Sequence, residues 1–289
     1  MGKLFVVATP IGNLNDISKR AIDTLTEVDI IAAEDTRQTI KLLNHFNIKN
    51  KMIAYHKFNE KEKSNILIEE LLSGKDIALV SDAGTPCISD PGYILIKKAH
   101  DMNIEVLGIP GPSATVTALS ISGLDTSNYT FIGFLPTDNK RFNLEIEKIQ
   151  KNDIRTFIIY ESPKRIVKLV EKLKDNFPKA RVFIASDLTK IHERTFFGTI
   201  ENVYDIIKED PNIEKGEYVL ILEKASESKI EVKNDISEEA MIIDYMVKNN
   251  CTVKDAISNI CHLNKNIKKN SLYEASLNLK KIIGEKFGK

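Results

Sequence analysis

The sequence predicts an α/β fold followed by a short all-helical segment. In the first half, short apolar runs alternate with helical patterns, which is typical of a parallel sheet covered by helices on both faces. In the second half the apolar runs have mixed spacing, which indicates an α+β arrangement with some antiparallel pairing. From Ser237 the pattern is helical throughout. We therefore expect two α/β domains, over residues 1–113 and 114–225, and a helical tail over residues 237–289.

Five apolar runs of the first half are expected to be buried strands, at residues 4–8, 28–33, 52–55, 76–80 and 105–109. Apolar residues recur at helical spacing after each of them, around residues 17–25, 40–46, 60–73, 94–98 and 114–123. Asn15 or Asp16 is expected to cap the first of these helices, because short polar side chains accept hydrogen bonds from the first free amides.

The second half is expected to contain five more strands, at residues 129–134, 156–160, 182–185, 196–199 and 217–222. A charged helix is expected over residues 139–150. Residues 225–236 are polar and resemble a linker, so the helical tail should be joined to the rest through them.

Composition limits the partners and the compartment. The 289 residues balance 41 basic against 41 acidic side chains, so no global charge indicates a nucleic-acid partner, although a local patch remains open. Three cysteines without metal-ligand spacing indicate a reducing compartment. The N-terminus enters a strand without a signal-peptide pattern, and no apolar run approaches the roughly 18 residues of a membrane span. We expect a soluble cytoplasmic protein.

Four strand ends of the first half carry glycine, proline or polar clusters, at residues 9–14, 34–37, 81–92 and 110–114. Loops at the carboxyl ends of parallel strands converge, so they are expected to build one site. In the longest loop, Gly84 and Gly92 permit positive φ or close backbone approach. Free amides and Asp82 could then hold an adenosine or amino-acid ligand. An elaborate structural turn is the alternative.

Motifs for other chemistries are missing from the sequence. No Gly-x-Gly-x-x-Gly follows the first strand, which argues against an ordinary dinucleotide fold, and no His-Glu-x-x-His or Gly-x-Ser-x-Gly occurs. No metal site is expected. Glu34 and Asp35 lie at a strand end, where either could be functional or Asp35 could cap the next helix. Arg37 and Arg165 could bind phosphate or form surface ion pairs.

The tail has an uneven charge. Residues 262–289 hold seven lysines against two glutamates. This indicates either a surface that contacts phosphates or a solvated helix face.

Seven motifs in order carry a resemblance to a known family. They are Thr-Pro-Ile-Gly-Asn-Leu at 9–14, Ala-Glu-Asp-Thr-Arg at 33–37, the stretch 81–92, Pro-Gly-Pro-Ser-Ala at 110–114, Gly-Phe-Leu-Pro at 133–136, Tyr-Glu-Ser-Pro at 160–163 and Leu-Thr-Lys at 188–190. With these motifs the chain resembles the tetrapyrrole-methylase-like (class III) methyltransferases, and within them the branch that modifies ribosomal RNA. The similarity covers nearly the whole chain.

The resemblance implies S-adenosylmethionine bound in the cleft between two α/β domains. Together with Asp82 from the loop argument, the expected cofactor contacts are Pro10, Asp82, Ala83, Gly84, Thr85, Ile88, Ser113, Ala114, Glu161 and Leu188. The catalytic candidates, chosen by location, are Glu34, Asp35, Arg37 and Lys190. Lys164, Ser186 and Asp187 depart from the residues common in the family.

The implied reaction is 2'-O-methylation of a cytidine in the decoding region of 16S rRNA. The implied partners are the small ribosomal subunit and a second copy of the chain. Two alternative functions are a small-molecule methylase of the tetrapyrrole type and a non-catalytic RNA-binding assembly factor. The basic tail and the Ala33–Arg37 motif favour the RNA enzyme.

Overall fold

A computed structural model describes residues 1–225, 237–263 and 267–287 of the chain. These residues divide into one compact unit that runs from Met1 to Ala225 and a second, helical unit that follows it. Most of the expected linker, residues 226–236, lies outside the described residues.

The first sheet is parallel throughout, as predicted. Its strands lie in the order β3-β2-β4-β1-β5. They are β1 (Leu4–Val7), β2 (Ile30–Ala33), β3 (Met52–Ala54), β4 (Ile77–Val80) and β5 (Val106–Ile109). The helices that follow them are α1 (Lys19–Glu27), α2 (Thr36–His45), α3 (Glu60–Leu72), α4 (Tyr93–Asp101) and α5 (Ala114–Ile121).

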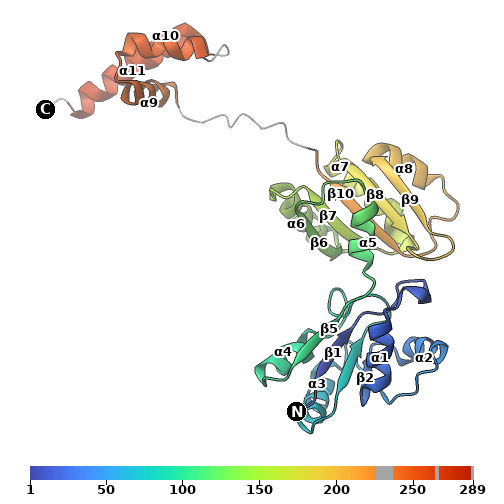
Figure 1. The fold of residues 1–289 in the computed structure, drawn as a ribbon. Helices are drawn as coiled ribbons and strands as arrows, with labels where there is room; N and C mark the ends of the chain where they lie inside the picture. The colour runs from blue at the N-terminus through green and yellow to red at the C-terminus, as the bar shows by residue number, and fades with distance from the viewer. Residues whose placement is uncertain (226–236, 264–266, 288–289) are drawn as a thin grey trace. The chain divides into compact units, whose positions relative to one another are not determined.

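Helices cover both faces of this sheet (Figure 1). Leu67 of α3 and Leu95 of α4 pack in one apolar cluster, which also contains Leu79 of β4. Leu25 of α1 and Leu43 of α2 pack in a second cluster, on the opposite face. Successive residues of each strand point into alternate clusters. Burial on both sides explains why the strands are continuous apolar runs.

The cap of the first helix differs from the prediction. Neither Asn15 nor Asp16 caps α1, because both belong to a short 3₁₀ turn over Leu14–Asp16. Ile17 after this turn is extended, and the helix begins only beyond Ser18, whose hydroxyl accepts a hydrogen bond from the Ala21 amide at 3.1 Å. The polar run offered several cap candidates, and the 3₁₀ turn moved the cap toward the C-terminus.

The second sheet has the predicted mixed pairing. Its order is β6-β7-β10-β8-β9, in which β6 and β7 are parallel and the other pairs are antiparallel. The strands are β6 (Tyr129–Phe134), β7 (Thr156–Glu161), β8 (Arg181–Ser186), β9 (Arg194–Thr199) and β10 (Tyr218–Glu223). On one face pack α6 (Asn139–Lys151), α7 (Ile166–Asn176) and α8 (Ile200–Lys208). On the other face lies α5, through Ala118 and Leu119.

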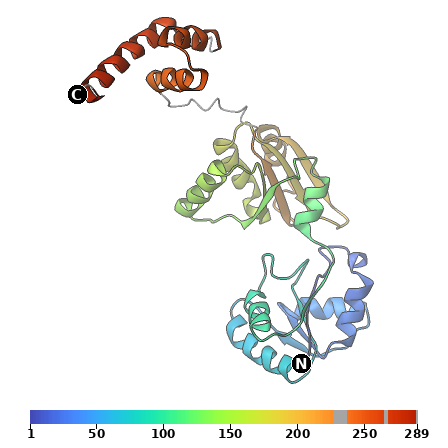
Figure 2. The ribbon, with the colours of Figure 1, turned by 60° about the vertical axis from the view of Figure 1, so that its left-hand side comes forward.

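The second unit is the expected helical tail. It consists of α9 (Glu238–Asn249), α10 (Val253–Leu263) and α11 (Lys269–Phe287). These helices pack around a small core that includes Ile242, Ile257 and Leu272, and Figures 1 and 2 show them side by side. Within the described parts of the chain, no helix is both long and apolar enough to cross a membrane.

Candidate functional site

A cavity of about 400 Å³ lies where the loops of the first sheet meet β7, β10 and the β8–β9 connection. This volume falls within the roughly 300–1,000 Å³ that is typical of small-molecule sites. Eight of the ten predicted cofactor contacts line it: Ala83, Gly84, Thr85, Ile88, Ser113, Ala114, Glu161 and Leu188. The cavity therefore brings together segments that are far apart in sequence, from Ile11 to Val219.

The other two predicted contacts lie beside the cavity and do not line it. Pro10 is buried next to Ile11, which does line the cavity. Asp82 is exposed, and its carboxylate accepts a hydrogen bond from the Asp35 amide at 3.0 Å. Asp82 therefore joins the loop after β4 to the loop after β2.

Three loops of the first sheet are joined at Gly84. Its N–H and C=O exchange hydrogen bonds with the backbone of Thr9, at 3.0 and 2.9 Å. Gly84 has φ of +78°, and an added Cβ would lie 3.3 Å from Cγ2 of Ile11. The Thr85 hydroxyl donates to the Pro112 carbonyl at 3.2 Å. Glycine is favoured here because both the positive φ and the close approach to Ile11 would strain a larger residue.

The second sheet supplies the opposite wall through the loop after β8. The Asn13 amide donates to Oγ1 of Thr189 at 3.0 Å. A Cβ on Gly12 would lie 2.8 Å from the Leu188 carbonyl oxygen and 2.6 Å from Cγ of Lys190. The loop after β1 is therefore packed against the loop that carries Leu188. This contact closes the cavity on one side.

Glu161 ends β7 as a buried carboxylate with fixed partners. It accepts hydrogen bonds from the Ser162 amide and from Nε of Arg165, both at 2.7 Å. Arg165 thus forms an ion pair within the site wall, one of the two roles considered for it from sequence. These partners satisfy the hydrogen-bonding capacity of a carboxylate that is removed from water.

The lining residues that the sequence analysis missed include two aromatic and two acidic side chains, Phe134, Tyr160, Asp90 and Glu217. Tyr160 shares a hydrogen bond of 2.7 Å with the Thr115 hydroxyl, and its ring meets that of Phe134 at 5.8 Å between centroids. Phe134 and Tyr160 lie in two of the seven motifs, and Asp90 lies in the 81–92 stretch. Their presence in these motifs was the available signal.

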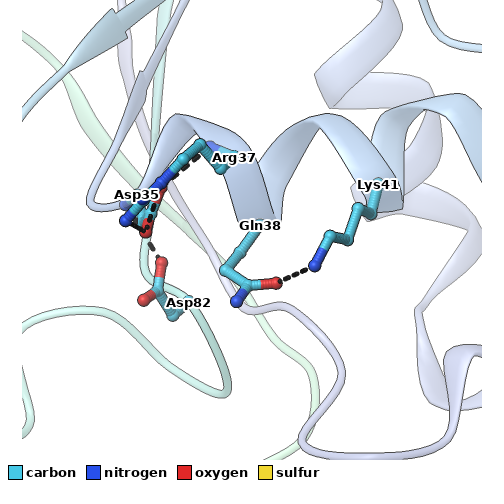
Figure 3. A network of polar contacts seen from close by, with 5 residues as sticks. All are labelled: Asp35, Arg37, Gln38, Lys41 and Asp82. Carbon is cyan, nitrogen blue, oxygen red and sulfur yellow. Dashed lines mark hydrogen bonds and ion pairs between the residues drawn. The ribbon is translucent and has the colours of Figure 1, made fainter.

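The two carboxylates that follow β2 differ in chemistry. Asp35 caps α2, where it accepts from the Arg37 amide at 2.8 Å and pairs with the Arg37 guanidinium (Figure 3). The hydrogen bonds from Arg37 lower the pKa of Asp35 to about 2. Burial, and then the charges of Asp90 and Asp82, raise the pKa of Glu34 to about 6. Glu34 can therefore change its protonation near neutral pH.

Lys190 does not line the cavity. Its ammonium group donates to Asp187 at 2.8 Å and to Glu217 at 3.1 Å. Burial opposes its charge, but these two carboxylates hold the pKa of Lys190 above its ordinary value. Lys190 therefore stays protonated and joins Asp187 to Glu217, which lines the cavity.

The cavity lies between one parallel and one mixed sheet, and both sheets are covered by helices. Residues 3–204 match the family Tetrapyrrole (Corrin/Porphyrin) Methylases, so the chain belongs to this family. It is an S-adenosylmethionine-dependent methyltransferase. Within the family it is similar to proteins named Ribosomal RNA small subunit methyltransferase I, which confirms the resemblance seen in the motifs.

The relative from Haemophilus influenzae is 42% identical over 96% of both chains. The relative from Escherichia coli O157:H7 is 39% identical over 96% of this chain and 95% of its own. Among solved structures, uroporphyrin-III C-methyltransferase from Thermus thermophilus, complexed with S-adenosyl homocysteine, matches with a TM-score of 0.53 at 14% identity. The match covers 77% of this chain and 97% of that one. Diphthine synthase matches with a TM-score of 0.56 at 15% identity, over 77% and 90%. These two structures share the fold.

Proposed function

We propose that the chain methylates the 2'-hydroxyl of a cytidine in the decoding region of 16S rRNA, with S-adenosylmethionine as the donor. The observation that carries this proposal is the extent of the similarity. The relatives from Haemophilus influenzae and Escherichia coli O157:H7, both named for ribosomal RNA, match 96% of the chain, so these two matches extend into the helical tail. The match to the uroporphyrin enzyme covers 77% of this chain but 97% of that enzyme. Almost none of the enzyme's length is therefore left over to form a comparable tail.

The cavity fits the proposed donor. Its walls are largely apolar, as a nucleoside requires, and carboxylates of Asp90, Glu161 and Glu217 place negative charge beside a cationic ligand. When bound, the donor supplies an electrophilic methyl group. The backbone of residues 83–85, Ile88 and residues 113–114 would hold the donor on one side. Glu161 and Leu188 would hold it on the other.

The residues after β2 are proposed to serve the RNA. A ribose hydroxyl must lose its proton as the methyl group is transferred, and an acceptor with a pKa near the working pH suits this step. The raised pKa of Glu34, about 6, meets this requirement. Asp35 is instead paired with Arg37, which lowers its pKa, and Lys190 stays protonated. The Arg37 side chain is 87% exposed and could also contact a backbone phosphate.

Cofactor binding is expected to need no metal. Within the described ranges, His, Cys, Asp and Glu side chains do not gather in groups of three that could hold an ion. The donor carries its own reactive methyl group. Titration calorimetry after treatment with a chelator should give the same affinity for S-adenosylmethionine as before, and affinity that returns only with added metal would contradict this.

The basic tail is proposed to bind RNA. Lys268, Lys269, Lys280 and Lys281 are exposed on the second unit, while Lys265 and Lys289 lie outside the described residues. Replacing these four exposed lysines by glutamine should weaken RNA binding. It should also lower the slope of log affinity against log salt by about 0.7 for each phosphate that the tail no longer neutralises. Fluorescence anisotropy over a salt series measures the slope.

Affinity for S-adenosylmethionine should not change in this variant. The matched control replaces Lys140, Lys148 and Lys151 of α6, which are exposed on the second sheet's helical layer. An unchanged salt slope in the tail variant would mean that the tail is only a solvated surface or a contact between copies.

The substrate is tested by methyl transfer from labelled donor to three acceptors: naked 16S rRNA, assembled small subunits and a tetrapyrrole. Label on the ribose of one cytidine supports the proposal. Label on the tetrapyrrole alone identifies a small-molecule methylase, and RNA binding without transfer identifies an assembly factor. We further propose a homodimer in the cytoplasm. Light scattering of the purified chain tests the dimer.

A further inference from the structure

The loop between β3 and α3, residues 55–59, carries the most exposed aromatic ring of the described chain. Phe58 is 95% exposed, while the next most exposed phenylalanine or tyrosine, Tyr93, reaches 68%. A phenylalanine in full contact with water gains nothing from the fold, since burying it would release about 1.5–3 kcal/mol. Contact with a partner molecule would recover part of this free energy.

The loop that presents Phe58 is held by specific hydrogen bonds. Asn59 accepts from the His56 amide at 2.8 Å and donates to the Ala54 carbonyl at 3.0 Å. The Asn59 amide also donates to the His56 carbonyl at 2.9 Å. Phe58 therefore lies in a turn that is closed by the hydrogen bonds of Asn59 to His56 and Ala54.

The same loop is tied to both sides of the proposed site. The Tyr55 amide donates to the Ala33 carbonyl at 2.7 Å, so the loop leaves the sheet beside Glu34. Glu60 at its far end accepts from the Gly92 amide at 2.9 Å and from the Tyr55 hydroxyl at 3.1 Å. Gly92 ends the stretch that lines the cavity. The loop that carries Phe58 therefore begins beside the strand end that precedes Glu34, and it ends at a hydrogen bond to the 81–92 stretch.

The surroundings of Phe58 combine aromatic and basic groups. The His56 ring meets the Phe58 ring edge-on, with 6.1 Å between centroids. Lys57 precedes Phe58 and Lys61 follows it in the sequence, and both side chains are exposed. Nδ1 of His56 is buried and has no hydrogen-bond partner among the described residues. Buried polar atoms without a hydrogen-bond partner are rare in folded proteins.

We propose that Phe58 is a stacking platform for an unpaired nucleobase of the RNA, beside the proposed methyl-transfer site. This inference rests on the proposed function. Single-stranded RNA is recognised by bases that stack on aromatic rings and by cations that meet the backbone. Phe58 supplies the ring, His56 supports its edge, and Lys57 and Lys61 supply the charge for the adjoining phosphates.

The test compares Phe58→Ala with Phe58→Trp. The alanine variant should raise KM for the RNA substrate by roughly 5- to 140-fold, the range that follows from removing one base stack. It should leave affinity for S-adenosylmethionine and the melting temperature near those of the parent. The tryptophan variant should keep the parent's KM, because it retains a π-face. Leu144→Ala, at a residue 50% exposed on α6, is the matched control.

A binding measurement separates this inference from the proposed function. A short single-stranded RNA that contains 2-aminopurine should lose fluorescence on binding to the parent, because the base stacks. Phe58→Ala should abolish that quenching, even if the parent transfers no methyl group to RNA. Equal quenching and equal KM in the alanine variant would overturn the proposal. So would a change of the alanine variant from dimer to monomer in light scattering, which would assign the ring to a second copy.

Discussion

Gly84→Val is expected to abolish binding of S-adenosylmethionine while the fold is retained. The residue lines the cavity at φ of +78°, and even a Cβ would come within 3.3 Å of Ile11. The two further methyl groups of valine must extend from that Cβ, either toward Ile11 or into the cavity. We expect affinity to fall at least about 100-fold, since roughly 3 kcal/mol of binding free energy corresponds to that factor.

Calorimetry measures this change in affinity, and circular dichroism with thermal melting shows whether the fold remains. Gly74→Val is the matched control, because Gly74 also has positive φ, at +101°, but an added Cβ there would meet no atom within 4 Å. Both variants carry the strain of a left-handed β-branched residue, and only Gly84→Val alters the cavity. Normal affinity in Gly84→Val would place the cofactor elsewhere.

Glu34→Gln is expected to lower the methyl-transfer rate by about 100-fold or more, the effect of losing a proton acceptor. The parent's rate should fall as pH decreases through about 6, because Glu34 accepts a proton only when ionised. The variant's residual rate should lack this dependence. Glu62→Gln, at an exposed carboxylate of α3, should behave as the parent. A rate near the parent's in Glu34→Gln would remove Glu34 from the reaction.

The same substitution has an expected effect on stability that is opposite in sign to its effect on rate. The pKa of Glu34 is raised in the folded chain, so protonated Glu34 contributes stability below pH 4.5 that is lost as pH rises through about 6. Glu34→Gln keeps a neutral group at every pH. At pH 8 its free energy of unfolding should exceed the parent's by about 1 kcal/mol, after allowance for solvent screening. At pH 4 the two should agree, and chemical denaturation at both pH values measures the difference.

The strands and loops could be predicted because their signals are local. Every expected strand was found within two residues of its predicted bounds. The mixed pairing of the second sheet also followed from the spacing of its apolar runs. The error at Ser18 arose where several polar residues compete for one cap, because the choice among them depends on whether the preceding turn is 3₁₀.

The charges of the site could not be predicted in the same way. Glu34 and Asp35 are neighbours with similar intrinsic acidity, and sequence left open which would be functional. Their pKa values separate because Arg37 approaches one of them, while burial and the carboxylates of Asp82 and Asp90 act on the other. A pKa depends on distances of a few ångströms between residues far apart in the chain, and the sequence does not contain those distances.

The sequence by itself determined the order of the elements and three of the loops that line the cavity, at residues 9–14, 81–92 and 110–114, because hydrophobic periodicity and glycine or proline placement act on adjacent residues. The tertiary structure alone decided that α5 packs on the second sheet and that the Thr189 hydroxyl accepts a hydrogen bond from the Asn13 amide. It also decided that the Phe58 ring is left exposed to water. These features arise from contacts between segments that only the packed chain brings together.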